Sequence, residues 1–239
     1  ADNKILSFFV LFLKIIFYNF ADKIIAISNM SKSSLQKIVL FKDKITLIYN
    51  PYIEKILRIK KIKKKKLNNL NILSIGRLTK QKNFSLLINA VIRLSKKYNN
   101  LNLLIIGNGD LRDTLINKIK FHKNIKIINW KNQLRKYYLN SDLFILPSYY
   151  EGLPNVLLDA MNHEVPIIST NCSGARDILK GDSGGFIVPI NDQKELEKKI
   201  IFIIKNYSIA KNKVLKAKKK LYEFSDINLD KYYKLLCDI

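Results

Sequence analysis

A glycine and two cations stand together in the segment SIGRLTKQKN, where they could bind an anion. Gly76 ends a short apolar run, and Arg77 and Lys82 follow it at the predicted start of a helix. The free N–H groups of a helix start, the helix dipole and side-chain cations all attract negative charge. This turn is therefore a candidate diphosphate site. The alternative is that these are ordinary basic residues of a basic protein.

A carboxylate, Glu151, stands in the segment PSYYEGLPNVLLDAM, just before another predicted helix. Gly152 gives the backbone freedom there, and Pro154 suits the first position of a helix. Asp159 comes eight residues after Glu151, about two turns along the helix at ~1.5 Å per residue. Two acids in this arrangement could hold two hydroxyl-bearing parts of one extended ligand. A helix cap at Glu151 and a solvated acid at Asp159 are the alternative.

A glycine-rich turn, GNGDL, follows another apolar run and contains Gly107 and Gly109. It is not a dinucleotide-binding fingerprint, because Arg112 occupies the position of the third glycine. The glycines permit a close approach of the backbone to a ligand. A plain tight turn is the simpler explanation when the loop is read alone.

These turns need a fold that brings them together, and the rest of the sequence predicts one. Short Ile- and Leu-rich runs alternate with helical patterns from residue 71 onward, as in the doubly wound parallel sheet of an α/β protein. Such a sheet binds ligands at the carboxyl ends of its strands. The predicted strands are residues 71–75, 101–106, 125–128, 143–146, 166–169 and 185–188, and the predicted helices are residues 83–97, 110–121, 133–139, 155–161, 175–179 and 192–204.

The chain outside this sheet divides into shorter segments. Residues 1–50 contain two predicted strands, 23–27 and 45–49, and a helix at 31–40 behind a serine cap. So few elements cannot complete a parallel sheet, so we expect a remnant of another domain there. A basic linker at 51–70, the sheet domain at 71–222 and a C-terminal helix at 223–239, within a helical region from Ile209 to Cys237, complete the prediction. The chain begins with Ala1, so we expect it to be part of a longer protein.

Composition excludes several classes of protein. The net charge is +24 and 48% of the residues are hydrophobic, which excludes global disorder. The two cysteines, Cys172 and Cys237, are far apart in the sequence, which argues against a disulfide framework and suits a reducing compartment. The two histidines, His122 and His163, are too few for a histidine-rich zinc or iron site.

The positive charge has two explanations. Lys, Ile and Asn are abundant throughout, as a biased genome produces, yet such charge also attracts phosphates and anionic lipids. The densest run, residues 54–66, holds eight basic residues and no aromatic residue. Proteins that stack nucleic-acid bases need aromatic side chains, so we expect no specific nucleic-acid partner.

One segment, Ile5 to Phe20, is almost entirely apolar. It is short for a membrane span, which needs ~20 apolar residues. Ser7 and Lys14 fall on one narrow polar edge of the predicted helix. Packing on a sheet in a domain core and lying in a membrane surface explain this segment equally well.

Several segments in a fixed order carry a resemblance to a known family. They are SIGRLTKQKN, LLIIGNGDLRDTL, SDLFILPSYYEGLPNVLLDAM, VPIISTNCSGARDIL and GGFIVP, and the match around them covers residues 71–200. This order resembles the Rossmann-like C-terminal nucleotide-sugar domain of GT-B glycosyltransferases, the large retaining group called glycosyltransferase family 4 or group 1. The segments ADKIIAIS and LIYNP resemble the end of that family's N-terminal domain.

The resemblance implies a role for each matching residue. Arg77 and Lys82 match the basic pair that binds the donor diphosphate and stabilises the departing phosphate. Glu151 matches the first acid of the family's Glu-x7-Glu motif, which faces the donor sugar, and Asp159 matches the second, which holds the ribose. Trp130 falls where the family frames the base. The predicted site thus comprises the catalytic residues Arg77, Lys82 and Glu151 and the substrate-binding residues Gly76, Gly107, Asn108, Trp130, Gly152, Leu153, Pro154, Asn155 and Asp159.

The resemblance also implies the reaction. It implies transfer, with retention, of a hexose or N-acetylhexosamine from a nucleotide-sugar, most simply a UDP-sugar, to a cell-surface glycan or lipid-linked acceptor of the capsule or lipopolysaccharide type. The family needs no metal or other cofactor, and front-face attack needs no protein nucleophile. A cytoplasmic protein, peripheral on the inner face of the plasma membrane, is expected, since basic side chains attract anionic lipids there.

Three departures from the family pattern leave alternatives open. Asp159 is one methylene shorter than the usual Glu, and Glu164 replaces a common glycine, which predicts a rebuilt turn. Most of the N-terminal domain, which supplies the acceptor site, is missing. A partner chain would then have to supply it, or the chain is a non-catalytic nucleotide-sugar-binding fragment or subunit. A sugar-nucleotide epimerase of the same fold is a further alternative.

Overall fold

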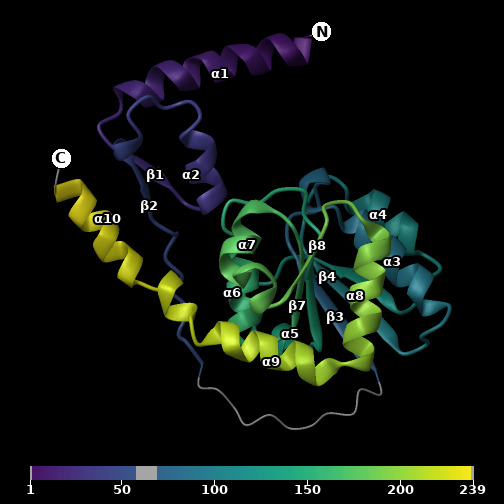
Figure 1. The fold of residues 1–239 in the computed structure, drawn as a ribbon. Coiled ribbons are helices and arrows are strands. Elements are labelled where there is room, and N and C mark those ends of the chain that lie inside the picture. Colours follow the sequence, from purple (N-terminus) through teal and green to yellow (C-terminus); the bar gives the residue numbers. More distant parts are fainter. Residues whose placement is uncertain (1, 58–68, 238–239) are drawn as a thin grey trace. The chain divides into compact units, whose positions relative to one another are not determined.

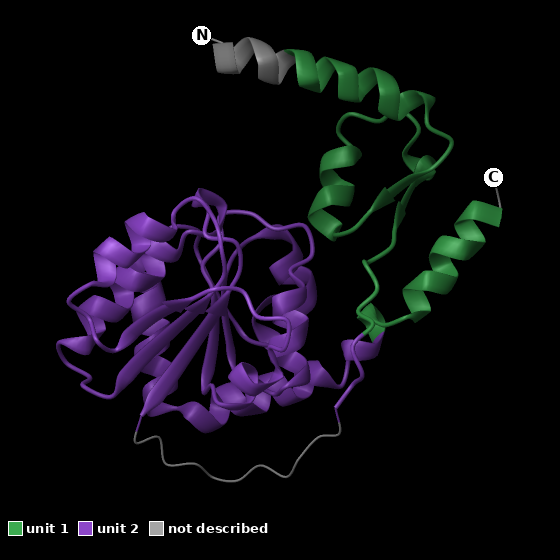
Figure 2. Ribbon diagram, turned by 180° about the vertical axis from the view of Figure 1, so that it is seen from behind, with its two compact units in different colours: residues 1–53, 223–239 green, residues 54–222 purple. Residues whose placement is uncertain are grey.

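The computed structural model describes residues 2–57 and 69–237, with side chains of the first helix described from Phe9 onward. Most of the predicted basic linker lies outside these residues. The chain forms two compact units, which Figure 2 shows in different colours. Unit 1 consists of residues 1–53 and 223–239, and unit 2 of residues 54–222. The C-terminal segment from residue 223 therefore groups with the N-terminal residues.

Unit 2 contains a six-stranded, wholly parallel sheet in the order β5-β4-β3-β6-β7-β8. The predicted doubly wound α/β fold is confirmed. The direction of winding reverses between β3 and β6, which are neighbours in the sheet. The strands are β3 (Leu70–Ile75), β4 (Leu101–Ile106), β5 (Ile125–Ile128), β6 (Leu143–Leu146), β7 (Ile167–Thr170) and β8 (Phe186–Val188).

Helices cover both faces of this sheet (Figure 1), which is why its central strand β6 is apolar and buried at every position. Helices α3, α4 and α8 lie on one side of the sheet, and α6 and α7 lie on the other. On the first side, Leu87, Ile88 and Val91 of α3 join the buried cluster formed by alternate residues of β3 and β4. The helices are α3 (Phe84–Ser95), α4 (Arg112–Ile119), α5 (Arg135–Leu139), α6 (Asn155–Asn162), α7 (Ser173–Leu179), α8 (Gln193–Lys205) and α9 (Tyr207–Lys218).

Unit 1 is smaller, with a two-stranded parallel sheet of β1 and β2. Ala26, Val39 and Ile45 form its small buried core. The predicted helix at 31–40 is wrong in its bounds, because Ser28 caps an earlier start and Ser31 completes a capping box with it. The elements are α1 (Asp2–Phe20), β1 (Ile24–Ala26), α2 (Asn29–Leu35), β2 (Ile45–Leu47) and α10 (Ile227–Cys237), with a 3-10 turn at Leu221–Phe224 before α10.

The C-terminal helix α10 is held against the end of the N-terminal segment. The Tyr232 hydroxyl donates to the backbone oxygen of Ile48 and to Asn50 Oδ1, each at 3.4 Å. The rings of Tyr49 and Phe224 lie with centroids 4.8 Å apart. These contacts explain why the two ends of the chain form one unit.

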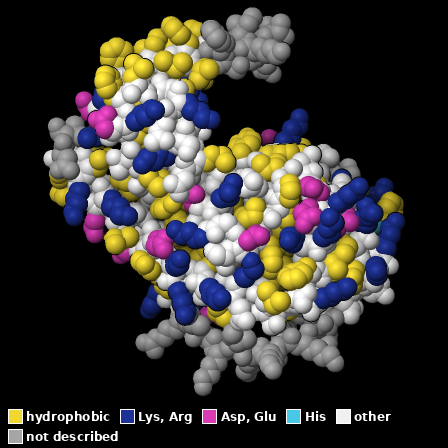
Figure 3. All heavy atoms as spheres, in the orientation of Figure 1, with side chains coloured by type: hydrophobic (Ala, Val, Ile, Leu, Met, Phe, Trp, Pro, Cys, Tyr) yellow, Lys and Arg dark blue, Asp and Glu magenta, His cyan; other side chains and the backbone are white. Residues whose placement is uncertain are grey.

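Helix α1 is mostly unburied, and apolar side chains gather on it in Figure 3. Tyr18 packs against the core of unit 1, as the core interpretation of this segment requires. Phe12, Phe17 and Phe20 are 53%, 65% and 82% exposed. In the described part of the chain, no helix has the length and apolar character needed to cross a membrane.

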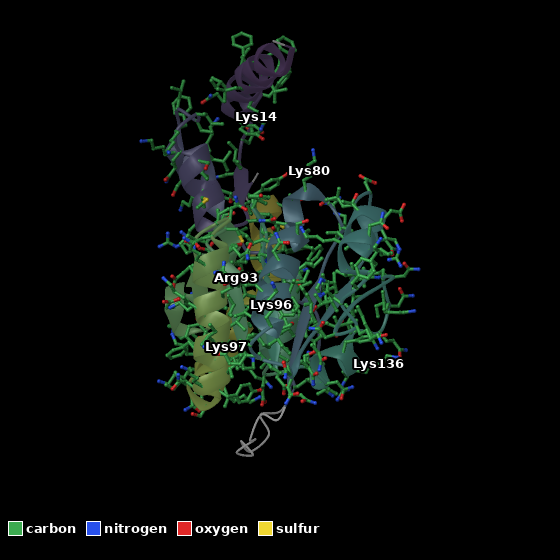
Figure 4. All side chains as sticks on the ribbon, turned by 90° about the vertical axis from the view of Figure 1, so that its right-hand side faces the viewer. Lys14, Lys80, Arg93, Lys96, Lys97 and Lys136 are labelled. Atoms are coloured by element: carbon green, nitrogen blue, oxygen red, sulfur yellow. The ribbon has the colours of Figure 1, made fainter. Side chains whose placement is uncertain are left out.

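Basic side chains of unit 2 are distributed over several elements. Figure 4 shows Lys80 near the 3-10 turn at Lys80–Lys82, Arg93, Lys96 and Lys97 along and after α3, and Lys136 on α5.

Candidate functional site

The candidate site lies where the winding of the sheet reverses. The turn after β3 carries Gly76, Arg77 and Lys82, and the turn after β6 carries Ser148 and Glu151. Because β3 and β6 are parallel neighbours, both turns leave the same edge of the sheet. Ligands of open α/β sheets bind in the crevice at such a point.

Lys82 and Glu151 form a close ion pair at this end of the sheet, although 69 residues separate them in the chain. Lys82 Nζ lies 2.6 Å from Glu151 Oε1, and the two side chains are only 13% and 9% exposed. Gly76 leaves room for the lysine, since a Cβ atom there would lie 3.1 Å from Lys82 Cε. The structure thus brings together three predicted site residues.

Ser148 is the second donor to the carboxylate of Glu151. Its hydroxyl is fully buried and donates to the same atom, Glu151 Oε1, at 2.6 Å. Glu151 makes no helix cap, because α6 begins at Asn155 with Pro154 at its N-cap position and without a side-chain cap. Pro154 therefore precedes the first helical position instead of occupying it.

Hydroxyl groups from the neighbouring strand and helix hold the Glu151 turn. The Thr170 hydroxyl, at the end of β7, donates to the backbone oxygen of Ser148. The Ser173 hydroxyl, at the start of α7, donates to the backbone oxygen of Glu151. Sequence reasoning did not place Ser148, Thr170 and Ser173 in the candidate site. The available signal was that each follows the carboxyl end of a predicted strand.

Backbone and amide contacts join the turns after β3 and β6 directly. The Tyr149 N–H donates to the backbone oxygen of Gln81, and Gln81 Nε2 donates to the backbone oxygen of Tyr150, both at 2.8 Å. Tyr149 also donates from its hydroxyl to Asn191 Oδ1 at 3.2 Å. These contacts fix the segment that carries Lys82 beside the segment that carries Glu151.

The glycine-rich turn after β4 packs against the first turn. A Cβ atom on Gly107 would clash with the backbone oxygen of Gly76, so the close approach is to protein backbone. Asn108 accepts the Leu78 N–H at its backbone oxygen at 2.8 Å. Its side-chain oxygen accepts a hydrogen bond from the backbone N–H of Trp130 at 3.3 Å, and the Trp130 residue is 47% exposed. The turns after β4 and β5, which carry Gly107, Asn108 and Trp130, therefore lie at the same end of the sheet as the turn after β3.

The remaining predicted residues differ in accessibility. Arg77 is exposed, and its side chain makes no hydrogen bond or ion pair with another described residue. Asp159 is half-buried in the middle of α6. The others are Gly152 and Asn155, which are exposed, and Leu153 and Pro154, which are buried and can offer a ligand only backbone groups.

Three buried polar atoms at this edge lack a hydrogen-bond partner among the described residues. They are Thr79 Oγ1 after β3, Arg112 Nη1 after β4 and Asn171 Oδ1 after β7. Buried polar groups are ordinarily paired, so unpaired ones at one end of a sheet are typical of a site that a ligand or water completes.

The negative charge of Glu151 also affects a nearby thiol. Burial raises the pKa of Cys172, and the Glu151 carboxylate raises it further. Cys172 is therefore a protonated, unreactive group at neutral pH. No three His, Cys, Asp or Glu side chains of the described residues gather in a metal-binding cluster, and metal independence stays a prediction.

Comparison with known proteins gives the following matches. A family model described as "Glycosyl transferases group 1" matches residues 55–221. The amylovoran biosynthesis glycosyltransferase AmsD of Erwinia amylovora is 29% identical over 206 residues, which cover 84% of this chain and 57% of AmsD. The UDP-Gal:alpha-D-GlcNAc-diphosphoundecaprenol alpha-1,3-galactosyltransferase of Escherichia coli is 30% identical over 125 residues, 49% of this chain and 32% of that protein.

The fold is also found in solved structures. The crystal structure of Anabaena Alr3699/HepE in complex with UDP-glucose matches with a TM-score of 0.81 and 18% identity, covering 96% of this chain and 67% of that chain. This likeness shows a shared fold. The chain spans 57% and 32% of the lengths of the two curated relatives above.

Proposed function

This chain belongs to the glycosyl transferases group 1 family, and we propose that unit 2 binds a UDP-sugar donor in the crevice between β3 and β6. The Lys82–Glu151 pair carries the proposal, because it places a cation and a carboxylate together at the edge where such sheets bind ligands. The cation suits a diphosphate and the carboxylate suits sugar hydroxyls. Arg77 adds a second, exposed cation to the same turn.

The two cations would act on the leaving group. As the bond between sugar and diphosphate breaks, negative charge grows on the phosphate oxygens, and fixed cations nearby lower the energy of that state. Arg77 makes no side-chain hydrogen bond or ion pair with the described residues, so its full charge is available. Lys82 is shared with Glu151, so its hydrogen bonds must redistribute when a diphosphate arrives.

Glu151 would hold the donor sugar, and Asp159 the ribose. Oε1 of Glu151 accepts hydrogen bonds from Lys82 and Ser148, which suits a carboxylate that orients a hydroxyl rather than one that attacks as a nucleophile. Asp159 lies half-buried on α6, the helix that follows the Glu151 turn. We propose that Trp130, exposed beside Asn108, contacts the uracil base.

The names of the relatives support a proposal for the class of acceptor. The name of the Escherichia coli relative gives UDP-Gal as donor, a diphosphoundecaprenol-linked sugar as acceptor and an α-1,3 product. The name of AmsD gives a role in amylovoran biosynthesis. We propose transfer of a hexose or N-acetylhexosamine to a cell-surface glycan or lipid-linked acceptor, without a metal. Since UDP-galactose holds its sugar in an α linkage, an α product supports retention.

A lipid-linked acceptor would bring the protein to the inner face of the plasma membrane. The exposed Phe12, Phe17 and Phe20 of α1 and the net charge of +24 support peripheral contact with anionic lipid. The alternative is that this chain binds the donor without transferring sugar. In that alternative, a partner chain would complete the enzyme.

Calorimetric titration of residues 1–239 with UDP, UDP-glucose, UDP-galactose, UDP-N-acetylglucosamine and UDP-N-acetylgalactosamine tests the proposal, with released UDP assayed in the same samples. We expect saturable binding of UDP and of at least one donor without added metal. Binding without release would support the donor-binding alternative. Absence of binding by every compound would overturn the proposed donor site.

A further inference from the structure

We propose that Ser148 is a positioning residue, which holds one oxygen of Glu151 so that the other is presented to the ligand. The proposal rests on the donor site proposed above and deepens it. It assigns different tasks to the two oxygens of one carboxylate, and it gives the hydroxyl of a fully buried serine a part in recognising the intact donor.

The hydrogen bonds of Glu151 divide unequally between its two oxygens. Lys82 Nζ and Ser148 Oγ both donate to Oε1 at 2.6 Å. No side chain or backbone group of the described residues donates to Oε2. The Glu151 side chain as a whole is 9% exposed, so part of it is accessible from outside the protein. Oε2 is therefore the atom of Glu151 that can accept a ligand hydroxyl.

Of the two donors, Ser148 is the one whose position the fold fixes. It lies two residues beyond β6, and its backbone oxygen accepts the Thr170 hydroxyl from the end of β7. Its side chain has a single rotatable bond to the hydroxyl group, whereas Lys82 reaches Oε1 through a long, flexible chain. A rigid short donor defines the orientation of a carboxylate better than a flexible one.

Ligand binding makes this difference more important. A diphosphate in the crevice would compete for Lys82, whose ammonium group has three donors to share. Ser148 is buried and shielded from that competition. It would keep Oε1 fixed while Lys82 turns toward phosphate, so that Oε2 stays directed at the sugar throughout binding.

The proposal predicts that Ser148→Ala separates the binding of UDP from the binding of the intact donor. UDP carries no sugar for Glu151 to hold, so its Kd should change by less than about twofold. The Kd of the preferred UDP-sugar should rise about three- to fivefold, because the charge-assisted hydrogen bond from the sugar to Glu151 is weakened but not removed. Both constants are measured by calorimetry on the full 239-residue chain.

Ser74→Ala is the matched control. Ser74 is also fully buried in the same sheet, and its hydroxyl donates to the backbone oxygen of Ile145 at 2.6 Å, away from Glu151. It should lose stability, as Ser148→Ala does, and keep the ratio of the two dissociation constants. Ser148→Thr, which retains the hydroxyl, should restore most of the ratio.

A double-mutant cycle with Glu151→Ala shows whether Ser148 acts through Glu151. Once the carboxylate is absent, Ser148→Ala should leave the ratio of the two constants unchanged. An equal effect in both backgrounds, or an equal loss for UDP and UDP-sugar, would overturn the positioning role. If the unaltered chain binds neither compound, the proposed donor site itself fails. If it binds both and Ser148→Ala behaves like the unaltered chain, this inference alone fails.

Discussion

Glu151 and Glu164 are two mostly buried carboxylates of unit 2, both paired with lysine, at opposite ends of the sheet. Glu151 follows the carboxyl end of β6, and Glu164 precedes the amino end of β7. Lys218 Nζ lies 2.9 Å from Glu164 Oε1, and Lys211 Nζ lies 3.4 Å from Oε2. Both oxygens of Glu164 are thus paired with lysine inside the fold, whereas Lys82 and Ser148 both donate to the same oxygen of Glu151, Oε1.

The surroundings of Glu164 explain its structural use. Lys211 and Lys218 belong to α9, which contacts α6, and the Lys218 side chain is only 2% exposed. Lys211 also donates to the backbone oxygen of Glu164 at 2.6 Å. A buried charge that loses its partner is strongly destabilising. Glu164 therefore holds α9 against the turn between α6 and β7.

The turn at Glu164, where a glycine is common in the family and a rebuilt turn was expected, has an unusual backbone conformation. The residue has a φ of +61°, the left-handed conformation that glycine adopts most easily. The backbone at this position is therefore glycine-like, and the side chain that replaces the glycine hydrogen pairs with α9. The two lysine–carboxylate pairs therefore differ in how many of the carboxylate oxygens the protein itself occupies.

The largest expected effect is a loss of stability when Glu164 is removed from its ion pair with Lys218. Glu164→Ala should lower the free energy of unfolding by about 3–5 kcal/mol, because Lys218 is left buried and unpaired. Urea unfolding measures this change. Glu164→Gly should be less harmful by about 1 kcal/mol, since glycine relieves the left-handed backbone. A UDP Kd that changed in the folded Glu164→Gly protein would contradict the assignment of this pair to structure alone.

The next largest effect is expected on UDP affinity, when Lys82 of the Lys82–Glu151 pair is replaced. Lys82→Ala should weaken UDP binding about 10- to 100-fold through loss of a charge-assisted phosphate contact, and Arg77→Ala should act in the same direction. Lys80→Ala removes an equal charge from an exposed position two residues earlier and is the control in the same titration. Equal losses of UDP affinity in Lys80→Ala and Lys82→Ala would contradict a specific phosphate contact by Lys82, because general electrostatic attraction would then explain both.

A smaller effect is expected at Glu151 itself. Glu151→Gln keeps the shape of the side chain and removes its charge, so UDP affinity should stay within about twofold. Affinity for the intact donor should fall about five- to tenfold, because a charged acceptor of the sugar hydroxyl becomes a neutral one. Titration with both compounds checks this. Equal losses for UDP and donor would make Glu151 structural, like Glu164.

The smallest effect is expected at Lys211, whose side chain is 21% exposed. Burial lowers the pKa of Lys211, and nearby Glu164 only partly opposes this. Lys211→Met should therefore cost less than about 1 kcal/mol, and Lys218→Met more. Between the lowered pKa and the usual 10.5, Lys211 holds a proton in the unfolded protein more often than in the folded protein, so unfolding takes up a proton. The free energy of unfolding therefore rises with pH in this range. Urea unfolding of Lys211→Met and the unaltered protein across that pH range should show the difference.

Much of unit 2 was predictable because its signals are local. Runs such as Leu143–Leu146 are apolar at every position, which indicates a strand covered on both faces, and the structure has β6 there. The alternation of such runs with helical patterns predicted a parallel sheet. Parallel winding then places Lys82 and Glu151 at one edge of the sheet, whatever the details of their turns.

The contacts within the site were not predictable in the same way. Nothing near Glu151 in the sequence says that its partner is Lys82 rather than another of the many lysines. Likewise, Lys218 lies 54 residues from Glu164. The start of α2 at Asn29 was also missed, because Ser28 and Ser31 form a capping box there and Ser31 is inside the helix rather than at its cap.

The sequence by itself determined the parallel sheet of unit 2, the order of its strands and helices, and the turns at which Arg77, Lys82 and Glu151 stand, because burial and backbone preference act on neighbouring residues. Only the tertiary structure decided which lysine each carboxylate meets and which oxygen remains open. Those outcomes depend on distances of a few ångström between segments far apart in the chain. At that scale a buried charge without a partner is strongly destabilising. A single hydroxyl, such as that of Ser148, can donate a hydrogen bond to one particular oxygen of a carboxylate.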